Sequence, residues 1–514
     1  MDTAKRRALI AIGIPLIMVG IDGTILNVAL PTIARDLQTS SSELVWINSA
    51  YIIVFGSTIL LSAALGDKFG RRRVLQIGMA VFIVGSALSG ISDALDSATF
   101  LIFARALQGL GAGAIPPSTL SLIRSTFTDE KERARAIGIW AGLSGIGLAV
   151  GPVLGGLILN STEAWGWIFY INVPIVILGG AMIHRNASES RDPEAPPIDT
   201  PGALLSLAGL FALFYGLIEG PVRGWDSAPV LISFALAAVL LVWFVLYELR
   251  QKFPELDPRL FKAAAFTSGV LAITVAFLAL MGLVYELTLY LQTVRGFSPL
   301  KAGVSLVPFA LALFVIAPLA PKLAERHGDR ITVMAGMAVL GAGLLTFLAT
   351  SVDSSYWVVL VGLVLAGAGV SLIQPPASAA MMSSVSAAKA GMASGTNAAI
   401  RQIGASFGIA VMGGIGQSVF ASQLTDSAAF AKLPAEGQSV AESSISGAIA
   451  VGEKAGGMGG AELIEVASQG FVDGMHWAVI VAAAFAALGL LVAARMIPRR
   501  AEASGEHRRP AGGV

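Results

Sequence analysis

Cysteine is absent from the 514 residues of the chain, and histidine occurs only four times, at scattered positions. Without cysteine there is no disulfide, no thiolate nucleophile and no cysteine-based metal site, and the histidine spacing fits no metal site either. We therefore expect neither a metal nor a cofactor. Charged residues are scarce as well, at 13% of the chain against about 25% in soluble domains. The net charge of +1 argues against a nucleic-acid partner.

Hydrophobic residues make up 55% of the chain, and its mean hydropathy of +0.76 is typical of a membrane protein. Stretches of about 20 apolar residues are long enough to cross a bilayer as helices. The sequence predicts fourteen such spans, near residues 8–30, 44–65, 74–93, 98–122, 134–158, 166–184, 202–220, 228–248, 267–291, 300–322, 331–350, 355–379, 393–420 and 474–497. The expected fold is an all-α integral membrane protein.

The positive charges predict how these spans are oriented. If both termini are cytoplasmic, 26 of the 34 Lys and Arg residues fall at inner segments, six at outer segments and two within spans. Positively charged loops remain in the cytoplasm during insertion, so this bias favours cytoplasmic termini. If one span had been missed in this count, the Lys and Arg residues would not be concentrated on one side of the membrane. We therefore expect a multi-pass protein of the inner, cytoplasmic membrane.

A short charged loop occurs twice in the chain. Residues 66–74 read Gly-Asp-Lys-Phe-Gly-Arg-Arg-Arg-Val, and Glu-Arg-His-Gly-Asp-Arg at 325–330 follows the first acid–base pair by 258 positions. A Pro-Pro pair at 116–117 returns at 375–376, at an offset of 259. A single basic loop would indicate only on which side of the membrane the loop lies. Two independent pairs at nearly one offset indicate two homologous six-helix halves, as in secondary transporters.

These halves define the expected domains. An N-terminal six-helix bundle covers residues 1–185, and a linker with two inserted helices covers 186–262. A C-terminal six-helix bundle covers 263–497, and a cytoplasmic tail covers 498–514. The C-terminal bundle includes a long outer segment, 421–473, rich in Ala, Ser, Gly and Glu. This segment either caps the outer mouth or is a solvated connector, and we expect the connector.

Asp22 and Arg105 are charged residues inside predicted spans. An ionised carboxylate within a bilayer costs several kcal/mol unless it meets water or a partner, so Asp22 is a candidate for binding and releasing protons. Its alternative role is structural, as a carboxylate hydrogen-bonded to Thr24 or Asn27 at a helix bend. Arg105 stays charged and can hold a carboxylate. Its alternative role is helix packing, with the charge reaching one membrane face.

Five motifs resemble, in their order and spacing, those of one transporter family. Residues 22–31, Asp-Gly-Thr-Ile-Leu-Asn-Val-Ala-Leu-Pro, resemble the first-span signature of the drug:proton antiporters of the major facilitator superfamily. The other four resemble its motifs in the loop after span two and in spans four, five and six: 66–74, 105–111, 151–156 and 165–174. The span number, the insert and the long outer segment resemble the fourteen-span EmrB/QacA-type branch.

The resemblance implies roles for individual residues. Proton coupling is expected of Asp22 and Arg105, to which we add Glu286, an acid that either faces the cavity or lies solvated near the outer interface. The expected substrate cavity includes Asn27, Gln108, Asn397, Arg401 and Gln402. The residues expected to switch conformation are Gly66, Asp67, Gly70, Arg71, Arg72, Glu132, Gly151, Pro152, Gly155, Gly156, Glu325 and Arg326.

Two contacts of the charged loop are expected by the same resemblance. Asp67 meets the N-terminus of a helix of the opposite half, where the helix dipole favours an anion. Arg71 pairs with Glu132 or Asp129. These contacts would latch the inner face while the transporter is open outward. In span five, glycines at four-residue spacing allow close helix approach, and Pro152 bends the helix.

The second half departs from the QacA-like pattern. Asn397-x-x-x-Arg401-Gln402 resembles the EmrB-like members, and no acid occupies spans ten and thirteen, where QacA-like members place carboxylates for organic cations. Export of multivalent cations is therefore not expected. Neutral, weakly basic and anionic amphiphiles remain open as substrates.

The predicted function is proton-driven export of amphipathic small molecules such as drugs or antibiotics. The alternative is a dedicated exporter of one endogenous metabolite or lipid-like product, or a self-resistance pump. A channel is disfavoured because no filter sequence is present. An ATP-driven pump is excluded because the chain lacks a phosphate-binding Gly-x-x-x-x-Gly-Lys-Ser/Thr loop. No nucleophile–base set indicates an enzyme. We expect a monomer whose partners are the substrate, protons and the lipid bilayer.

Overall fold

The computed structural model describes residues 3–162, 164–191, 197–254, 256–385 and 390–497, and all regular structure in these ranges is helical. Thirteen helical segments there are long and apolar enough to cross a membrane. A further apolar stretch, Val150–Ser161, belongs to the helix that matches the fifth predicted span. The all-α membrane fold is thus confirmed, while the count of fourteen spans stays a prediction. The expected tail 498–514 lies outside the described residues.

Within the described residues 3–162 and 164–191, the N-terminal half contains eight helices, because two of its predicted spans are broken. The helix over residues 98–126 is interrupted just before Pro116, and the sixth span begins with a separate short turn of helix. The helices are α1 (Thr3–Asp36), α2 (Ser41–Phe69), α3 (Arg71–Leu95), α4 (Ala98–Gly113), α5 (Ile115–Thr126), α6 (Glu130–Ser161), α7 (Trp167–Tyr170) and α8 (Asn172–Asn186). Helix α2 begins at a capping box in which Ser40 and Glu43 exchange hydrogen bonds.

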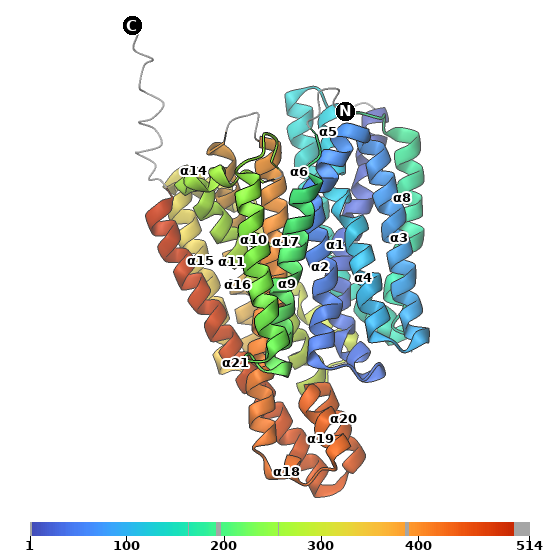
Figure 1. The fold of residues 1–514 in the computed structure, drawn as a ribbon, viewed down its shortest axis with the longest axis vertical. Helices are drawn as coiled ribbons and strands as arrows, with labels where there is room; N and C mark the ends of the chain where they lie inside the picture. The colour runs from blue at the N-terminus through green and yellow to red at the C-terminus, as the bar shows by residue number, and fades with distance from the viewer. Residues whose placement is uncertain (1–2, 163, 192–196, 255, 386–389, 498–514) are drawn as a thin grey trace.

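The two inserted helices are α9 (Thr200–Arg223) and α10 (Ala228–Glu248). Helix α9 packs against both α2 and α17, so the insert lies along the seam between the halves (Figure 1). Trp46 of α2 donates a hydrogen bond to the buried Glu219 carboxylate of α9 at 3.0 Å. On the other side, Phe214 of α9 packs edge-on to Phe407 of α17 at 5.3 Å between ring centroids.

The C-terminal half repeats the pattern with more breaks. Its elements are η1 (Pro258–Lys262), α11 (Ala264–Leu289), η2 (Tyr290–Val294), α12 (Pro299–Ser305), α13 (Val307–Ile316), α14 (Leu319–His327), α15 (Asp329–Thr346), η3 (Phe347–Ala349), α16 (Tyr356–Ser383), α17 (Ala390–Thr425), α18 (Ala428–Ala431), α19 (Ala435–Ser443), α20 (Ile445–Ala455) and α21 (Gly457–Met496). Helix α1 begins and α21 ends at the same end of the bundle, which we call the inner end (Figure 1).

The internal repeat is visible in the backbone. Gly70 between α2 and α3 and Gly328 between α14 and α15 have φ values of 112° and 89°, which favour glycine. A Cβ at Gly111 would lie 2.3 Å from the amide nitrogen of Phe82, and one at Gly369 would lie 2.5 Å from that of Leu340. The α3–α4 and α15–α16 pairs therefore use the same close packing, 258 positions apart.

Helices α18–α20 extend beyond the bundle at the end opposite the termini, which we call the outer end (Figure 1). The Ser444 hydroxyl donates to the Thr39 carbonyl of the N-terminal half at 3.4 Å, and the Gln417 amide donates to the Glu442 carbonyl at 2.8 Å. The segment 421–473 is therefore folded against the bundle and is more than the solvated connector that we expected.

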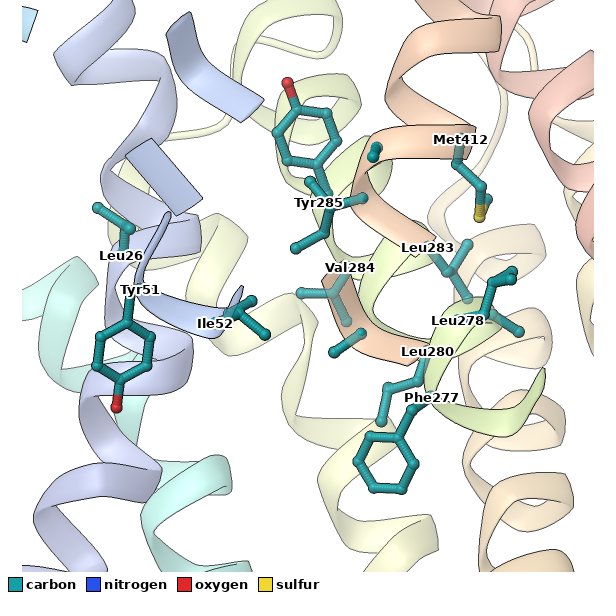
Figure 2. Close-up of a cluster of buried hydrophobic side chains, with 14 of the residues drawn as sticks. Leu26, Tyr51, Ile52, Phe277, Leu278, Leu280, Leu283, Val284, Tyr285 and Met412 are labelled. Atoms are coloured by element: carbon teal, nitrogen blue, oxygen red, sulfur yellow. The ribbon is translucent and has the colours of Figure 1, made fainter. Parts of the chain in front are cut away.

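Buried apolar side chains hold the halves together toward the outer end. Figure 2 shows Leu26 of α1 with Tyr51 and Ile52 of α2, and Ile52 is directed toward the α11 side chains that include Val284. Ile52 and Val284 are both buried. Burial of a side chain of this size contributes about 1.5–3 kcal/mol relative to exposure, so this contact favours a closed outer end.

Candidate functional site

A charged cluster lies in the middle of the N-terminal half. Asp22 of α1 is fully buried and accepts hydrogen bonds from the Arg105 guanidinium at 2.9 Å, the Gln108 amide at 2.7 Å and the Asn172 amide at 2.8 Å. Arg105 and Gln108 come from α4, one turn apart on the same face, and Asn172 is the first residue of α8. Three helices thus converge on one carboxylate, and their donors satisfy it inside the bundle.

Aromatic rings enclose the cation of this cluster. The Arg105 Cζ lies 4.2 Å from the centroid of the Tyr51 ring and 5.7 Å from that of the Phe169 ring. Arg105 is 1% exposed, so its charge is balanced inside the protein by Asp22 and by the ring faces. The alternative in which Arg105 reaches one membrane face does not match this burial.

Further hydrogen bonds orient the groups that surround Asp22. The Ser86 hydroxyl donates to the Phe169 carbonyl at 2.8 Å and accepts from Asn172 at 2.9 Å. Thr24 donates instead to backbone carbonyls of its own helix, and Asn27 accepts a hydrogen bond from Asn48. The structural alternative for Asp22, with Thr24 or Asn27 as partner, is therefore wrong about the partners.

A cavity of about 940 Å³ opens at the inner end between the two halves. The N-terminal half contributes apolar residues of α2 and α5 and the Trp140 indole, which donates to Thr119 at 3.1 Å. The C-terminal half contributes polar residues of α16 and α17. The volume lies within the usual range for small-molecule sites, about 300–1,000 Å³.

Two of the five predicted cavity residues line this space, namely Asn397 and Arg401. Gln402 faces α2 instead, because a Cβ placed on Gly56 would lie 2.8 Å from the Gln402 Cβ. This contact closes the cavity toward the outer end. Gln108 belongs to the Asp22 cluster, and Asn27 lies in the α1–α2 interface. In this conformation, neither of them lines the cavity.

The Asp22 cluster lies outward of the cavity. Tyr51, which stacks on Arg105, precedes Gly56 by five residues of α2, or about 7.5 Å along the helix. The charge pair is therefore separated from the cavity by roughly one and a half helical turns. A change in the α2–α17 contact at Gly56 and Gln402 would bring water close to it.

The glycine-rich stripe of α6 makes the contacts that close the outer end. A Cβ on Gly151 would lie 2.1 Å from the Thr24 hydroxyl oxygen, and one on Gly155 would lie 2.9 Å from Ile25, both next to Asp22 on α1. Across the seam, a Cβ on Gly156 would lie 2.5 Å from the Leu300 Cα of α12. The stripe therefore packs against the helix of Asp22 and against the opposite half.

Glu286 is placed differently from both expected alternatives. It is 2% exposed and does not line the cavity, so it is neither a cavity wall nor a solvated interface residue. A Cβ at Gly416 of α17 would lie 2.9 Å from its Oε1, and its buried Oε2 has no hydrogen-bond partner among the described residues. The carboxyl group is therefore sealed between α11 and α17.

The charged loop of residues 66–74 is held by the linker that follows α8. Glu189 accepts hydrogen bonds from the backbone amides of Arg72 and Arg73 at 2.9 and 3.1 Å, which places a carboxylate at the N-terminus of α3. A Cβ on Gly70 would lie 2.8 Å from the Glu189 carboxyl group. Gly66 precedes this turn and accepts the Gly70 amide. Sequence reasoning missed Glu189, which lies 117 positions from Arg72.

The expected pairing of Arg71 with Glu132 or Asp129 is not the one observed. Arg71 pairs with Asp67 at 2.9 Å, and its backbone amide donates to the Ser190 carbonyl. The Lys5 ammonium group instead hydrogen-bonds to Glu132 at 2.6 Å and lowers the pKa of that carboxyl group. With the inner end open, Asp67 lies at the cavity mouth, and its ion pair with Arg71 is within its own half.

In the second copy of the loop, Glu325 and Arg326 end α14 with exposed side chains. No group of three His, Asp or Glu residues that could hold a metal ion occurs in the part of the chain that the structure describes.

Comparison with known proteins shows which family has this architecture. Residues 13–409 match the family model of the Major Facilitator Superfamily. The chain is 35% identical to the multidrug resistance protein Stp of Mycobacterium tuberculosis over 98% of this chain and 94% of the relative. It is 31% identical to the tetracenomycin C resistance and export protein of Streptomyces glaucescens over 96% and 91%. It is 33% identical to the multidrug efflux pump LfrA of Mycolicibacterium smegmatis over 93% of both.

Solved structures agree in fold. A bacterial homologue of the lysosomal transporter Spinster, in an inward-facing and unoccupied conformation, gives a TM-score of 0.66 at 16% identity, with 96% of this chain and 98% of that chain covered. Transporters of this kind are not enzymes, and their many apolar helices cross the inner membrane repeatedly. The chain belongs to the Major Facilitator Superfamily, and its curated relatives are multidrug and antibiotic resistance efflux pumps.

Proposed function

We propose that this protein is a proton-coupled antiporter that exports amphipathic small molecules such as drugs or antibiotics by alternating access. The observation that carries the proposal is the buried Asp22–Arg105 pair, 2.9 Å apart and separated from a substrate-sized cavity. A titratable acid inside a bundle of membrane helices is costly to bury, and such residues commonly belong to proton pathways. The relatives named for resistance and export support the direction of transport.

Protonation of Asp22 changes the stability of the closed site. Adding a proton removes the negative charge that compensates Arg105, and an uncompensated buried charge costs about 3–5 kcal/mol. Proton binding is therefore favourable only in a conformation that hydrates the cluster or gives Arg105 a new partner. The site shown here, with three donors to one carboxylate, suits the proton-free form. This form is open inward and ready to take a substrate from the cytoplasm.

The glycine stripe of α6 provides a physical link between this site and the halves. Gly151 and Gly155 contact α1 beside Asp22, and Gly156 contacts α12 of the other half. A shift of α1 on protonation would therefore alter the contact that closes the outer end. Glu286, buried at the α11–α17 contact, is the second proton-coupling residue that we propose. We further propose that one chain suffices, because the cavity lies within a single protomer.

The test is a drug-susceptibility panel in a host without its own efflux pumps. Expression of the protein is expected to raise resistance to several amphipathic drugs, and a protonophore should abolish the drug efflux while ATP depletion with the proton gradient maintained should not. Resistance to a single compound among many would favour the dedicated exporter or self-resistance pump. Efflux that survives the protonophore would contradict proton coupling.

We expect Asp67→Asn to reduce transport strongly while leaving substrate affinity near normal. In the outward-open state we propose that Asp67 meets a helix N-terminus of the opposite half, a contact that contributes about 0.3–2 kcal/mol. Its loss would shift the equilibrium between conformations and leave the deep cavity intact. Transport and equilibrium binding of the same drug are the two measurements, with the exposed Asp226→Asn as control. An equal loss of affinity would show that Asp67 acts in binding.

We expect Gly303→Ala to slow transport by opening the outer end. A Cβ at Gly303 would lie 2.2 Å from the Pro152 carbonyl oxygen, so α6 and α12 must separate. Because the protein has no cysteine, a single cysteine at Ser41, near the outer end of α2, reports opening through its rate of labelling by an impermeant maleimide. Labelling should be faster in the Gly303→Ala background. Gly341→Ala is the control, since its nearest neighbour would lie at 3.8 Å.

A further inference from the structure

Arg401 is a cation deep in the cavity that the proton-coupling scheme does not use. It lies eleven residues into α17, about 16 Å along the helix from its inner start. The Arg401 side chain lines the cavity and is half-buried. Its Cζ lies 4.7 Å from the centroid of the Phe277 ring of α11. The ring supports the guanidinium from one side and leaves its positive charge without an anionic counterpart.

No ion pair or hydrogen bond to Arg401 is present among the described residues. Arg105 provides the contrast, because that cation is fully buried and paired with Asp22. In Arg401 the guanidinium fork remains available to a group that enters the cavity, and a guanidinium binds carboxylates, phosphates and similar oxyanions through two parallel hydrogen bonds.

The acids that line the cavity are already engaged and lie near its mouth. Asp67 pairs with Arg71, Asp257 accepts the backbone amide of Arg259 at 3.0 Å, and Asp199 accepts that of Gly202 at 3.0 Å. Asp67 lies in the last turn of α2, Asp199 directly precedes α9, and Asp257 directly precedes η1. None of these three carboxylates lies along α17 next to Arg401. The deep part of the cavity is therefore positive.

The walls around Arg401 suit an amphiphile. Asn397, one helical turn before Arg401 on the same face of α17, donates to the Ser378 hydroxyl at 2.7 Å and also lines the cavity. Leu60, Leu120 and Trp140 of the N-terminal half line the same cavity and offer an apolar and aromatic surface. One side of a bound molecule would thus meet a cation and an amide, and the other side would meet apolar groups.

We propose that Arg401, with Asn397 beside it, is the subsite for the acidic group of the substrate, so that this transporter prefers amphiphiles that carry one negative charge on an aromatic or apolar body. This inference rests on the proposed function for its physiological meaning, but it concerns binding and not proton coupling. Organic cations are excluded by the same charge, since no carboxylate among the described residues that line the cavity lies next to Arg401 to receive them.

The test measures equilibrium binding of two dyes that share a rhodamine ring system, with purified protein in detergent and no ion gradient. Sulforhodamine 101 is anionic and rhodamine 6G is cationic. Wild-type protein is expected to bind the anionic dye more tightly. Arg401→Gln should weaken that binding about ten- to hundredfold, as expected for loss of a hydrogen bond to a charged group, and should leave rhodamine 6G binding unchanged or tighter.

Two further variants separate recognition from misfolding. Arg401→Lys keeps the charge and loses the planar fork, so sulforhodamine 101 affinity should fall between those of the wild type and Arg401→Gln. Lys322→Gln removes one positive charge from the exposed surface of α14 and should change neither dye. Thermal unfolding in detergent checks that the variants are folded.

Competition distinguishes the two sources of such an anion. Displacement of sulforhodamine 101 by 1-naphthoate indicates a soluble organic acid, and displacement by lysophosphatidylglycerol but not by lysophosphatidylcholine indicates an anionic lipid head group. Either result supports the subsite. The proposal is overturned if wild-type protein binds neither dye, binds rhodamine 6G more tightly, or keeps its preference in Arg401→Gln. A preserved preference for anions together with export that ignores the proton gradient would overturn only the proposed coupling.

Discussion

Asp22→Asn is expected to abolish proton-driven export while the protein still folds and still exchanges substrate downhill. Asparagine keeps the size of the side chain and can accept from Gln108 and Asn172, but it does not titrate. Because asparagine does not bind or release protons, the pH gradient cannot drive transport through this site. Each unit of difference in pKa between two conformations corresponds to about 1.4 kcal/mol of driving force, and the variant loses all of it. Efflux from energised vesicles and exchange across unenergised ones are the two measurements.

A second variant guards this result against a folding artefact. Asp22→Asn leaves the buried Arg105 without its carboxylate, which is itself destabilising. The double variant Asp22→Asn/Arg105→Gln removes both charges and should fold at least as well, yet it should also lack proton-driven efflux. Full gradient-driven efflux by Asp22→Asn would end the role of Asp22 and make Glu286 the next residue to replace.

Cross-linking the outer ends of the two halves is expected to stop transport completely and reversibly. A Cβ at Gly413 of α17 would lie 3.4 Å from the Val45 Cγ2 of α2, so cysteines at these positions are close enough to form a disulfide. The wild-type chain has no cysteine to interfere. Oxidation of Val45→Cys/Gly413→Cys should trap the inward-open state, because the outer ends cannot separate. Reduction with dithiothreitol should restore transport.

The single variants Val45→Cys and Gly413→Cys serve as controls, since neither can form the bond. They should transport equally with and without oxidant, apart from any constant effect of the substitution itself. The extent of cross-linking is measured by mass spectrometry of the joined peptides. A fully cross-linked double variant that still transports would show that α2 and α17 do not separate at their outer ends during the cycle.

Much of the fold follows from features that one sequence displays directly. Apolar length predicts membrane helices because a bilayer has a set thickness. The internal repeat is visible in the sequence because the same turn between two helices occurs in both halves. Gly70 and Gly328 both adopt φ values there that favour glycine. Asp22 and Arg105 stand out for a similar reason, since a charge inside an apolar span requires a special environment.

Contacts between helices could not be predicted in the same way. A membrane helix is apolar toward lipid and toward its neighbours, so hydrophobic periodicity does not reveal which face meets the cavity. Asn397 and Arg401 line the cavity, whereas Gln402 and Asn27 lie against other helices. The polar character of these residues was visible in the sequence, but the direction in which each side chain points was not.

Partners distant in sequence were missed for a related reason. The meeting of Asp22 with Gln108 and Asn172 depends on how α1, α4 and α8 cross. Glu189 reaches the N-terminus of α3 from a linker with several other polar residues, so nothing in the sequence singled it out. Arg71 pairs with Asp67, four residues earlier in the same loop, and the expected partner Glu132 is held by Lys5 instead. The charges alone do not show which of several nearby partners each residue meets.

The most direct test of the whole mechanism is the simultaneous measurement of drug and proton movement by purified protein in proteoliposomes. The drug is one that the susceptibility panel identifies, and a trapped pH-sensitive dye reports protons. With a lumen more acidic than the outside, drug should accumulate inside as protons leave. In Asp22→Asn, both the accumulation of drug above its equilibrium level and the proton flux should vanish. Drug accumulation without proton movement, or equal fluxes in the variant, would contradict proton-coupled export through Asp22.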